Sequence, residues 1–116
     1  MKTLDATAHF KIKPGEIDAF KRKAAELIAV VKEKEKGVGS MQYDWFYNET
    51  LSECIVREIY ADSSAVLAHL VNVGGLLGEL LAISELSLTV CGSPSEELKK
   101  ASEGMNITYY TFEAGA

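Results

Sequence analysis

The chain has 116 residues, of which 47% are hydrophobic, and a formal net charge of −5. This length supports one compact core and is too short for two ordinary domains, so we expect a single domain over residues 1–116. The acidic balance disfavours nonspecific attraction to nucleic acid and to anionic membranes, so we expect neither as a partner.

The cysteines and the N-terminus indicate a reducing compartment. Cys54 and Cys91 lie far apart in the sequence, and the opening MKTLDATAHF lacks the apolar run of a secretory signal. We therefore expect a cytoplasmic protein with free thiols. Four residues interrupt the apolar stretch 66–83, which argues against a membrane span: Gly74, Gly75, Gly78 and Glu79.

The first third of the chain predicts a strand and a helix. Residues 4–13 alternate between apolar and polar side chains, as in a half-buried strand. Pro14-Gly15 breaks this strand, and apolar residues then recur every three or four positions over residues 17–31 of a helix that Gly37 ends. The interleaved acidic and basic residues over 16–36 indicate that the rest of this helix is a solvated face.

The next segment predicts a hairpin and more helix. Residues 40–47 and 51–60 are rich in β-formers and flank a short polar connection. Asp62 offers an N-cap oxygen for a helix that begins near Ala65 and continues to about Val71. Gly74-Gly75 is expected to loosen the backbone before a second helical piece over residues 76–83.

The C-terminal third predicts a strand over residues 86–92, a short helix over 95–102 and a last strand over 105–113. The sequence Ser93-Pro94-Ser95-Glu96 has the form of a capping box with proline at the first helical position. The resulting order is that of an α+β, ferredoxin-like split β-α-β antiparallel sheet with an added helix and strand.

Such a sheet carries helices on one face only, yet its strands have bulky groups on both. In the first strand of the hairpin, Phe46 points opposite to a set of large residues that alternation places together: Met41, Tyr43, Trp45 and Tyr47. A large exposed apolar face is uncommon on a monomer, so we expect a homodimer. The alternative is that residues 109–112 fold back over their own sheet.

Three segments carry a resemblance to a known family: FKIKPGEIDAFKRKAAEL at 10–27, EIYADSSAVLAHL beginning at Glu58, and CGSPSEEL at 91–98. Together they resemble the antibiotic biosynthesis monooxygenase family of the dimeric α+β barrel superfamily. The resemblance implies a dimeric barrel with a small cavity in each protomer, and oxidation of aromatic substrates without a prosthetic group or metal. The two cysteines, His9 and His69 also lack short ligand spacings, so no metal site is expected.

The candidate catalytic residues are His69 and Glu58. The unperturbed pKa of a histidine, near 6.5, lets it accept a proton around neutrality, and Glu58 is placed to orient it. Tyr43, Trp45 and Tyr60 are the candidate substrate-binding residues, because aromatic rings stack on planar ligands and bind their oxygens. Three alternatives stay open: a structural histidine, core or interface aromatics, and an interface salt bridge for Glu58.

These observations lead to the hypothesis of a cofactor-independent monooxygenase. It would oxidise a small phenolic, quinol or polyketide-like aromatic substrate with dioxygen, because loss of a substrate proton gives an anion that can reduce oxygen. One alternative is a non-catalytic dimeric module of the same fold that binds a small molecule. Another is a small-metabolite isomerase, which needs the same base and cavity but no oxygen.

Overall fold

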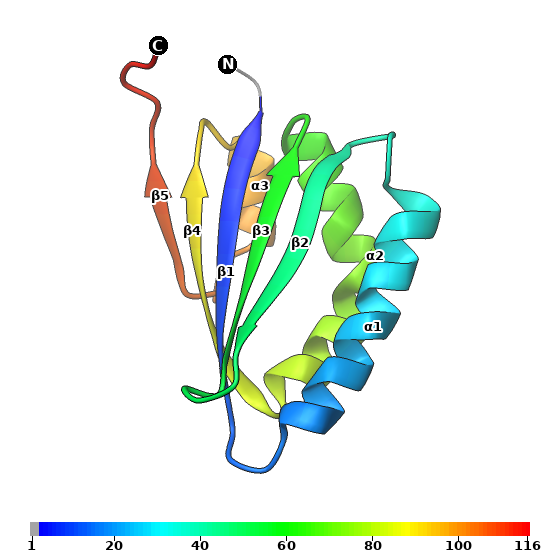
Figure 1. The fold of residues 1–116 in the computed structure, drawn as a ribbon. Coiled ribbons are helices and arrows are strands. Elements are labelled where there is room, and N and C mark those ends of the chain that lie inside the picture. Colours follow the sequence, from blue (N-terminus) through cyan, green and yellow to red (C-terminus); the bar gives the residue numbers. More distant parts are fainter. Residues whose placement is uncertain (1–2) are drawn as a thin grey trace.

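Five strands and three helices alternate along the chain in the computed structural model, which describes residues 3–116 (Figure 1). The elements are β1 (Leu4–Ile12), α1 (Ile17–Lys34), β2 (Ser40–Asn48), β3 (Glu53–Tyr60), α2 (Ser63–Leu81), β4 (Ser84–Cys91), α3 (Glu96–Ala101) and β5 (Ile107–Tyr110). This order is the predicted one, and the α+β ferredoxin-like class is confirmed.

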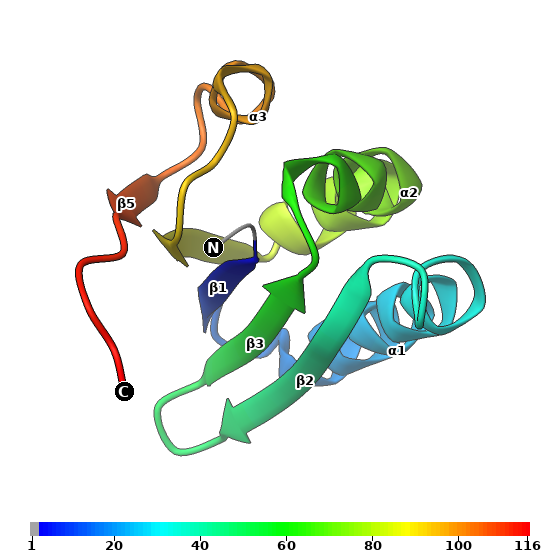
Figure 2. The ribbon, with the colours of Figure 1, turned by 90° about the horizontal axis from the view of Figure 1, so that it is seen from above.

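The strands form one sheet in the order β2-β3-β1-β4-β5, antiparallel except for β5, which runs parallel to β4. All three helices lie on one side of it (Figure 2). The central strand β1 buries alternate residues from Leu4 to Ile12 against these helices, and α1 contributes a stripe in which Phe20, Leu27 and Val31 are buried. The apolar side chains that alternate along β1 therefore face the apolar side chains that recur every three or four residues along α1.

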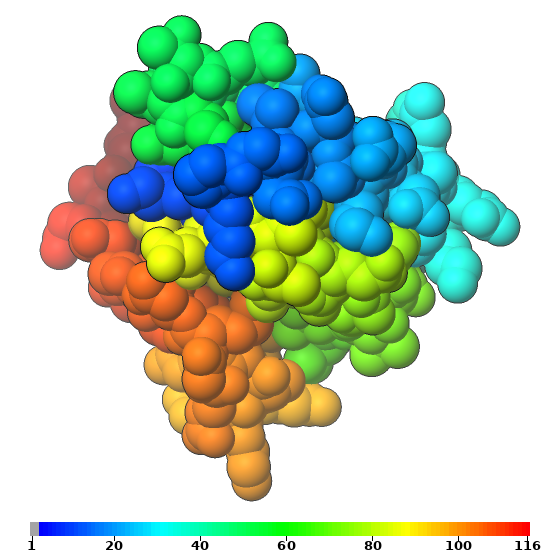
Figure 3. All heavy atoms as spheres, turned by 90° about the horizontal axis from the view of Figure 1, so that it is seen from below, coloured from blue at the N-terminus to red at the C-terminus, as the bar shows by residue number. Residues whose placement is uncertain are grey.

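Backbone hydrogen bonds connect three loops at the lower end of the molecule in Figure 1: those after β1, after β2 and before β4. The backbone N–H of Ile12 donates to the carbonyl of Ser52 at 2.8 Å, and that of Lys13 donates to Ile83 at 2.9 Å. In Figure 3 the blue turn after β1 accordingly lies between the green β2–β3 turn and the yellow start of β4. Gly15 has a φ of +80°, which explains why the chain breaks here rather than entering α1 directly.

Two expectations for the middle of the chain are wrong. Helix α2 does not loosen at its glycines but continues unbroken to Leu81, since packing of its buried residues outweighs the low helix propensity of glycine. A bulge between Ser40 and Gln42 turns Met41 outward, so it does not share a face with Tyr43.

Helix α2 is the one helix among residues 3–116 whose length and composition would allow it to cross a membrane. The prediction that the glycines exclude a membrane span is therefore wrong. Within the fold α2 buries His69, Val73 and Leu80, while its other residues are partly or fully exposed.

The C-terminal elements are shorter than expected. Ser95, not Ser93, caps α3, because its side chain accepts the N–H of Leu98 at 3.1 Å and Pro94 precedes the helix. Strand β5 ends at Tyr110 and forms the sheet edge, and Tyr110 and Phe112 are exposed. The segment 109–112 therefore does not cover the open face, where Phe46 and Ile55 remain exposed.

Close packing at Gly39 gives a test of the fold. A Cβ atom there would lie 2.7 Å from Cβ of Ala65 in the first turn of α2, while one at Gly75 meets nothing within 4 Å. We expect Gly39→Ala to lower the free energy of unfolding by roughly 1–3 kcal/mol through overpacking. Gly75→Ala should raise it by about 0.5–1 kcal/mol through helix propensity.

Urea denaturation of both variants measures these changes. Equal stability of Gly39→Ala and the wild-type protein would show that α2 can move away from the loop at little cost.

Candidate active site

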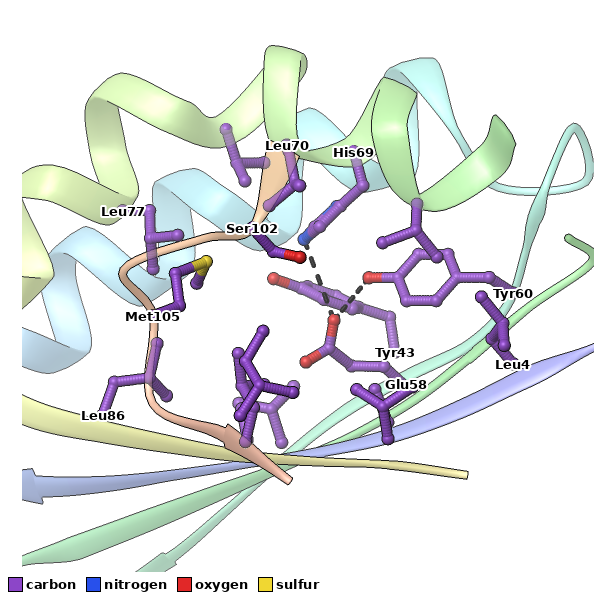
Figure 4. Close-up of a pocket in the computed structure, with 18 of the residues that line it drawn as sticks. Leu4, Tyr43, Glu58, Tyr60, His69, Leu70, Leu77, Leu86, Ser102 and Met105 are labelled. Carbon is purple, nitrogen blue, oxygen red and sulfur yellow. Dashed lines mark hydrogen bonds and ion pairs between the residues drawn. The ribbon is translucent and has the colours of Figure 1, made fainter. Parts of the chain in front are cut away.

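A cavity of about 90 Å³ lies between the sheet and helices α2 and α3 (Figure 4). The inner faces of the strands form its floor, and α2 and the segment from Leu98 to Tyr109 form its walls. Most of the lining side chains are apolar. The volume is below the roughly 300–1,000 Å³ of typical ligand pockets, so only a small molecule fits without rearrangement.

The polar side chains gather at one end of this cavity. Figure 4 shows Tyr43, Glu58, Tyr60 and His69 converging there, while Leu77, Leu86 and Met105 lie toward the other end. The strand register explains part of this cluster, because Tyr43 and Glu58 are direct partners on neighbouring strands.

His69 is held by a carboxylate from the end of α1. Its Nδ1 lies 2.9 Å from Oε1 and 3.1 Å from Oε2 of Glu35, and the side-chain amide of Asn72 donates to the same carboxylate at 3.3 Å. Asn72 is three residues beyond His69 on α2, so both project from one helical face. Glu35 and His69 are 5% and 8% exposed, which makes this a buried contact.

The loop after α1 fixes the position of Glu35. Its backbone N–H bonds to the carbonyl of Val31, and its own carbonyl accepts the N–H groups of Val38, Gly39 and Ser40 at 3.0–3.1 Å. Gly37 adopts a φ of +77° within this loop. The chain thus winds tightly around Glu35 and holds it beside α2.

Glu35 and Asn72 are not among the site residues predicted from the sequence, and the prediction that Glu35 lies on a solvated face is wrong. Because the residues on both sides of Glu35 are also charged, the sequence does not mark Glu35 as buried. A signal was present, however, because Glu35 lies four residues after Val31 and so continues the buried stripe of α1. An acidic residue on an apolar stripe indicates a buried partner.

The arrangement leaves His69 with a basic nitrogen toward the cavity. Burial lowers the pKa of His69, and the Glu35 carboxylate acts in the opposite direction. We assign the proton to Nδ1, which donates to Glu35, so the lone pair of Nε2 faces Oε1 of Glu58 at 3.8 Å. A neutral, oriented imidazole of this kind can accept a proton.

Glu58 is a buried carboxyl group that retains a proton near neutrality. Burial raises its pKa to about 7, partly offset by the hydrogen bond that the Tyr60 hydroxyl donates to Oε1 and reinforced by the nearby charge of Glu35. Glu58 can therefore act as acid or base beside His69. Glu35, rather than Glu58, holds the imidazole through its Nδ1.

The three expected substrate-binding aromatics all line the cavity. The Tyr60 hydroxyl is committed to Glu58. Tyr43 lies between two rings, with its centroid 5.3 Å from that of His69 and 5.8 Å from that of Trp45. The indole of Trp45 stacks on Phe10 at a centroid distance of 6.0 Å and an interplanar angle of 12°.

The other histidine and the cysteines lie apart from this cluster. His9 is on the opposite face of the sheet, where its Nε2 lies 2.7 Å from Oε1 of Glu53. Cys54 is buried in the core, Cys91 is exposed, and both are free thiols. Within residues 3–116, no three histidine, cysteine or acidic side chains are grouped as metal ligands.

The fold matches that of the antibiotic biosynthesis monooxygenase family, as the sequence resemblance predicted. One structure of an antibiotic biosynthesis monooxygenase is 22% identical, with a TM-score of 0.64 over 75% of this chain and 92% of that one. SnoaB, a cofactor-independent oxygenase from Streptomyces nogalater, is 13% identical, with a TM-score of 0.66 over 82% of this chain and 96% of that one.

MupZ from Pseudomonas fluorescens is similar over the full length. It is 27% identical, with a TM-score of 0.76, and the match covers 100% of this chain and 94% of that one. No family model and no curated protein matches the chain.

The buried Glu58 carboxyl gives a pH dependence of stability. Its pKa in the folded protein, about 7, lies above the ordinary value of 4.5, so the folded state binds the proton more tightly. The protonated Glu58 therefore makes its full contribution to the free energy of unfolding below about pH 4.5, and this contribution is lost as the pH rises toward 7. We expect wild type to lose up to about 3 kcal/mol relative to Glu58→Gln across this range.

Urea unfolding of both proteins at pH 5, 6, 7 and 8 measures the difference. A difference that stays flat or changes in favour of wild type as the pH rises would contradict the assignment of a protonated Glu58.

Proposed function

We propose that this protein is a cofactor-independent monooxygenase that oxidises a small phenolic, quinol or polyketide-like aromatic substrate with dioxygen. The observation that carries the proposal is the His69 imidazole, anchored through Nδ1 at 2.9 Å from Glu35, with its basic nitrogen at the polar end of an apolar cavity. The fold shared with monooxygenases supports it.

His69 acts as the general base in this reaction. Nε2 takes a proton from the substrate, and the resulting electron-rich anion transfers one electron to dioxygen. The two radicals combine to a peroxide. A base then removes the remaining hydrogen from the carbon that carries the peroxide, and the electron pair of that C–H bond forms a carbonyl as the O–O bond breaks. One oxygen atom stays on the substrate as this carbonyl, and the other leaves as water after protonation. Glu35 stabilises the imidazolium that forms, and Glu58 can supply a proton to the leaving oxygen.

The apolar walls support this chemistry by excluding water from the anion and its radical. The proposal requires no prosthetic group. We place the reaction in the cytoplasm, where Cys54 and Cys91 stay reduced.

An isomerase of a small keto compound is the second candidate. It is favoured by the 3.8 Å separation between Nε2 of His69 and Oε1 of Glu58, since one group can remove a proton while the other returns one elsewhere on the substrate. Product formation in an oxygen-free solution would favour the isomerase. Tight binding of a ligand that is recovered unchanged with oxygen present would favour a binding module.

Oxygen uptake with hydroquinone, a single-ring substrate, tests the monooxygenase. We expect His69→Ala to lower kcat/KM roughly 100-fold or more, because the base is lost. Glu35→Gln should cause a smaller loss, since the amide still accepts the Nδ1 proton but does not stabilise the imidazolium. Glu33→Ala, at an exposed position of α1, is the control.

Unchanged uptake in His69→Ala would remove this histidine from the mechanism. A loss of the same size in Glu33→Ala would attribute the effect to the fold rather than to the site.

We also propose a homodimer formed through the open face of the sheet. Phe46, Ile55 and His9 are neighbours in one row across β2, β3 and β1, and Phe46 and Ile55 are 54% and 40% exposed. No helix covers this face (Figure 2). Burial of these side chains against the same face of a second copy would remove apolar surface from water.

Sedimentation of wild type, Ile55→Asp and Val38→Asp tests the dimer. We expect twice the chain mass for wild type, the single-chain mass for Ile55→Asp because a charge enters the interface, and no change for Val38→Asp in an exposed loop. A wild-type protein that sediments as a single chain would refute the proposed dimer.

A further inference from the structure

A groove lies on the surface between the end of α1 and the start of β2. Its volume is about 400 Å³, against about 90 Å³ for the cavity at His69. Helix α1 contributes Ile28, Val31 and Lys32 to its lining, and β2 contributes residues 40–44. We call it the α1–β2 groove, and the candidate active site described above does not include it.

The groove and the cavity meet at Tyr43, which lines both. On α1 the two spaces are lined by neighbouring residues, Leu27 for the cavity and Ile28 for the groove. Tyr43 is half-buried, and its ring lies 5.3 Å from that of His69, centroid to centroid. The Tyr43 side chain therefore separates the α1–β2 groove from the candidate base.

The cavity by itself is too small for a substituted aromatic molecule. Its volume of about 90 Å³ is below that of typical ligand pockets, so only the reacting part of a larger substrate fits there. A substituent that leaves the cavity past Tyr43 enters the α1–β2 groove. The side chains of the groove therefore decide which substituent the protein accepts.

The charges in the groove favour an anion. Lys32 and Lys36 are exposed residues of its lining, and Asp44 is its acidic residue. None of the three has an ion-pair partner among residues 3–116. Two positive charges and one negative charge leave the groove with a net charge of +1, in a protein of net charge −5. This complements a group that carries a single negative charge, such as a carboxylate.

We propose that the α1–β2 groove binds the carboxylate of an aromatic acid whose reacting ring occupies the cavity. The ring hydroxyl faces His69, and the side chain of the substrate runs past Tyr43 along the apolar surface of Ile28. Its carboxylate then lies beside the ammonium groups of Lys32 and Lys36. This inference names the substrate class and rests on the proposed function of the cavity as the reaction site.

Binding of 4-hydroxyphenyl alkanoic acids and of their primary amides tests this site in oxygen-free solution, because each pair differs in charge but hardly in shape. A series of increasing chain length samples the separation between ring and charge. The single tryptophan, Trp45, lines the cavity, so its fluorescence reports entry of the ring. At pH 7 we expect one acid or more to change this fluorescence and to bind roughly tenfold more tightly than its amide. Added salt should reduce this preference, because it screens the charges.

Four variants assign the preference to the groove. Lys32→Gln and Lys36→Gln should each weaken binding of the acid roughly two- to fivefold and leave binding of the amide unchanged, as expected for exposed ion pairs. Asp44→Asn should strengthen binding of the acid, because it removes a negative charge from the groove. Lys34→Gln is the matched control, since Lys34 is an exposed lysine of α1 that lies outside the groove lining.

No binding of any acid, equal affinity for acid and amide at every chain length, or an equal loss in Lys34→Gln would overturn the carboxylate site. Binding that leaves the fluorescence of Trp45 unchanged would overturn the placement of the ring in the cavity. The titration uses neither oxygen nor turnover. Selective binding of an acid without oxygen uptake would therefore contradict only the proposed monooxygenase, and uptake with equal kcat/KM for acid and amide would contradict only the carboxylate site.

Discussion

The site depends on one buried contact, in which the Glu35 carboxylate at the end of α1 holds the His69 imidazole in the middle of α2. Both side chains are buried, so each provides the hydrogen-bond partner that water cannot provide to the other. The contact forms because the loop after α1 winds around the Glu35 carbonyl and because Gly39 lets α2 approach within van der Waals distance. The loop between α1 and β2 therefore determines both how closely α2 packs and where Glu35 meets His69.

The sheet supplies the second half of the site through its register. Pairing of β2 with β3 places Tyr43 beside Glu58, and alternation along β3 adds Tyr60 on the same face. The carboxyl group of Glu58 is buried in this setting, which raises its pKa, and faces the free nitrogen of His69. A base and a protonatable carboxyl group thus border one apolar cavity.

The C-terminal segment forms part of the cavity wall. Residues from Leu98 to Tyr109 close one wall of the cavity, and β5 adds a parallel edge strand to an otherwise antiparallel sheet. The same segment does not cover the outer face of the sheet, where Phe46 and Ile55 are exposed.

The sequence by itself determined the order of elements, the inward face of β1 and the N-cap at Asp62, because these follow from local periodicity and capping. It also placed His69, Glu58 and Tyr60 near one another in the chain. Only the tertiary structure decided that Glu35 is buried, that α2 continues through its glycines and that the Trp45 N–H has no hydrogen-bond partner among residues 3–116. These outcomes depend on contacts between segments distant in sequence, which local propensity does not contain.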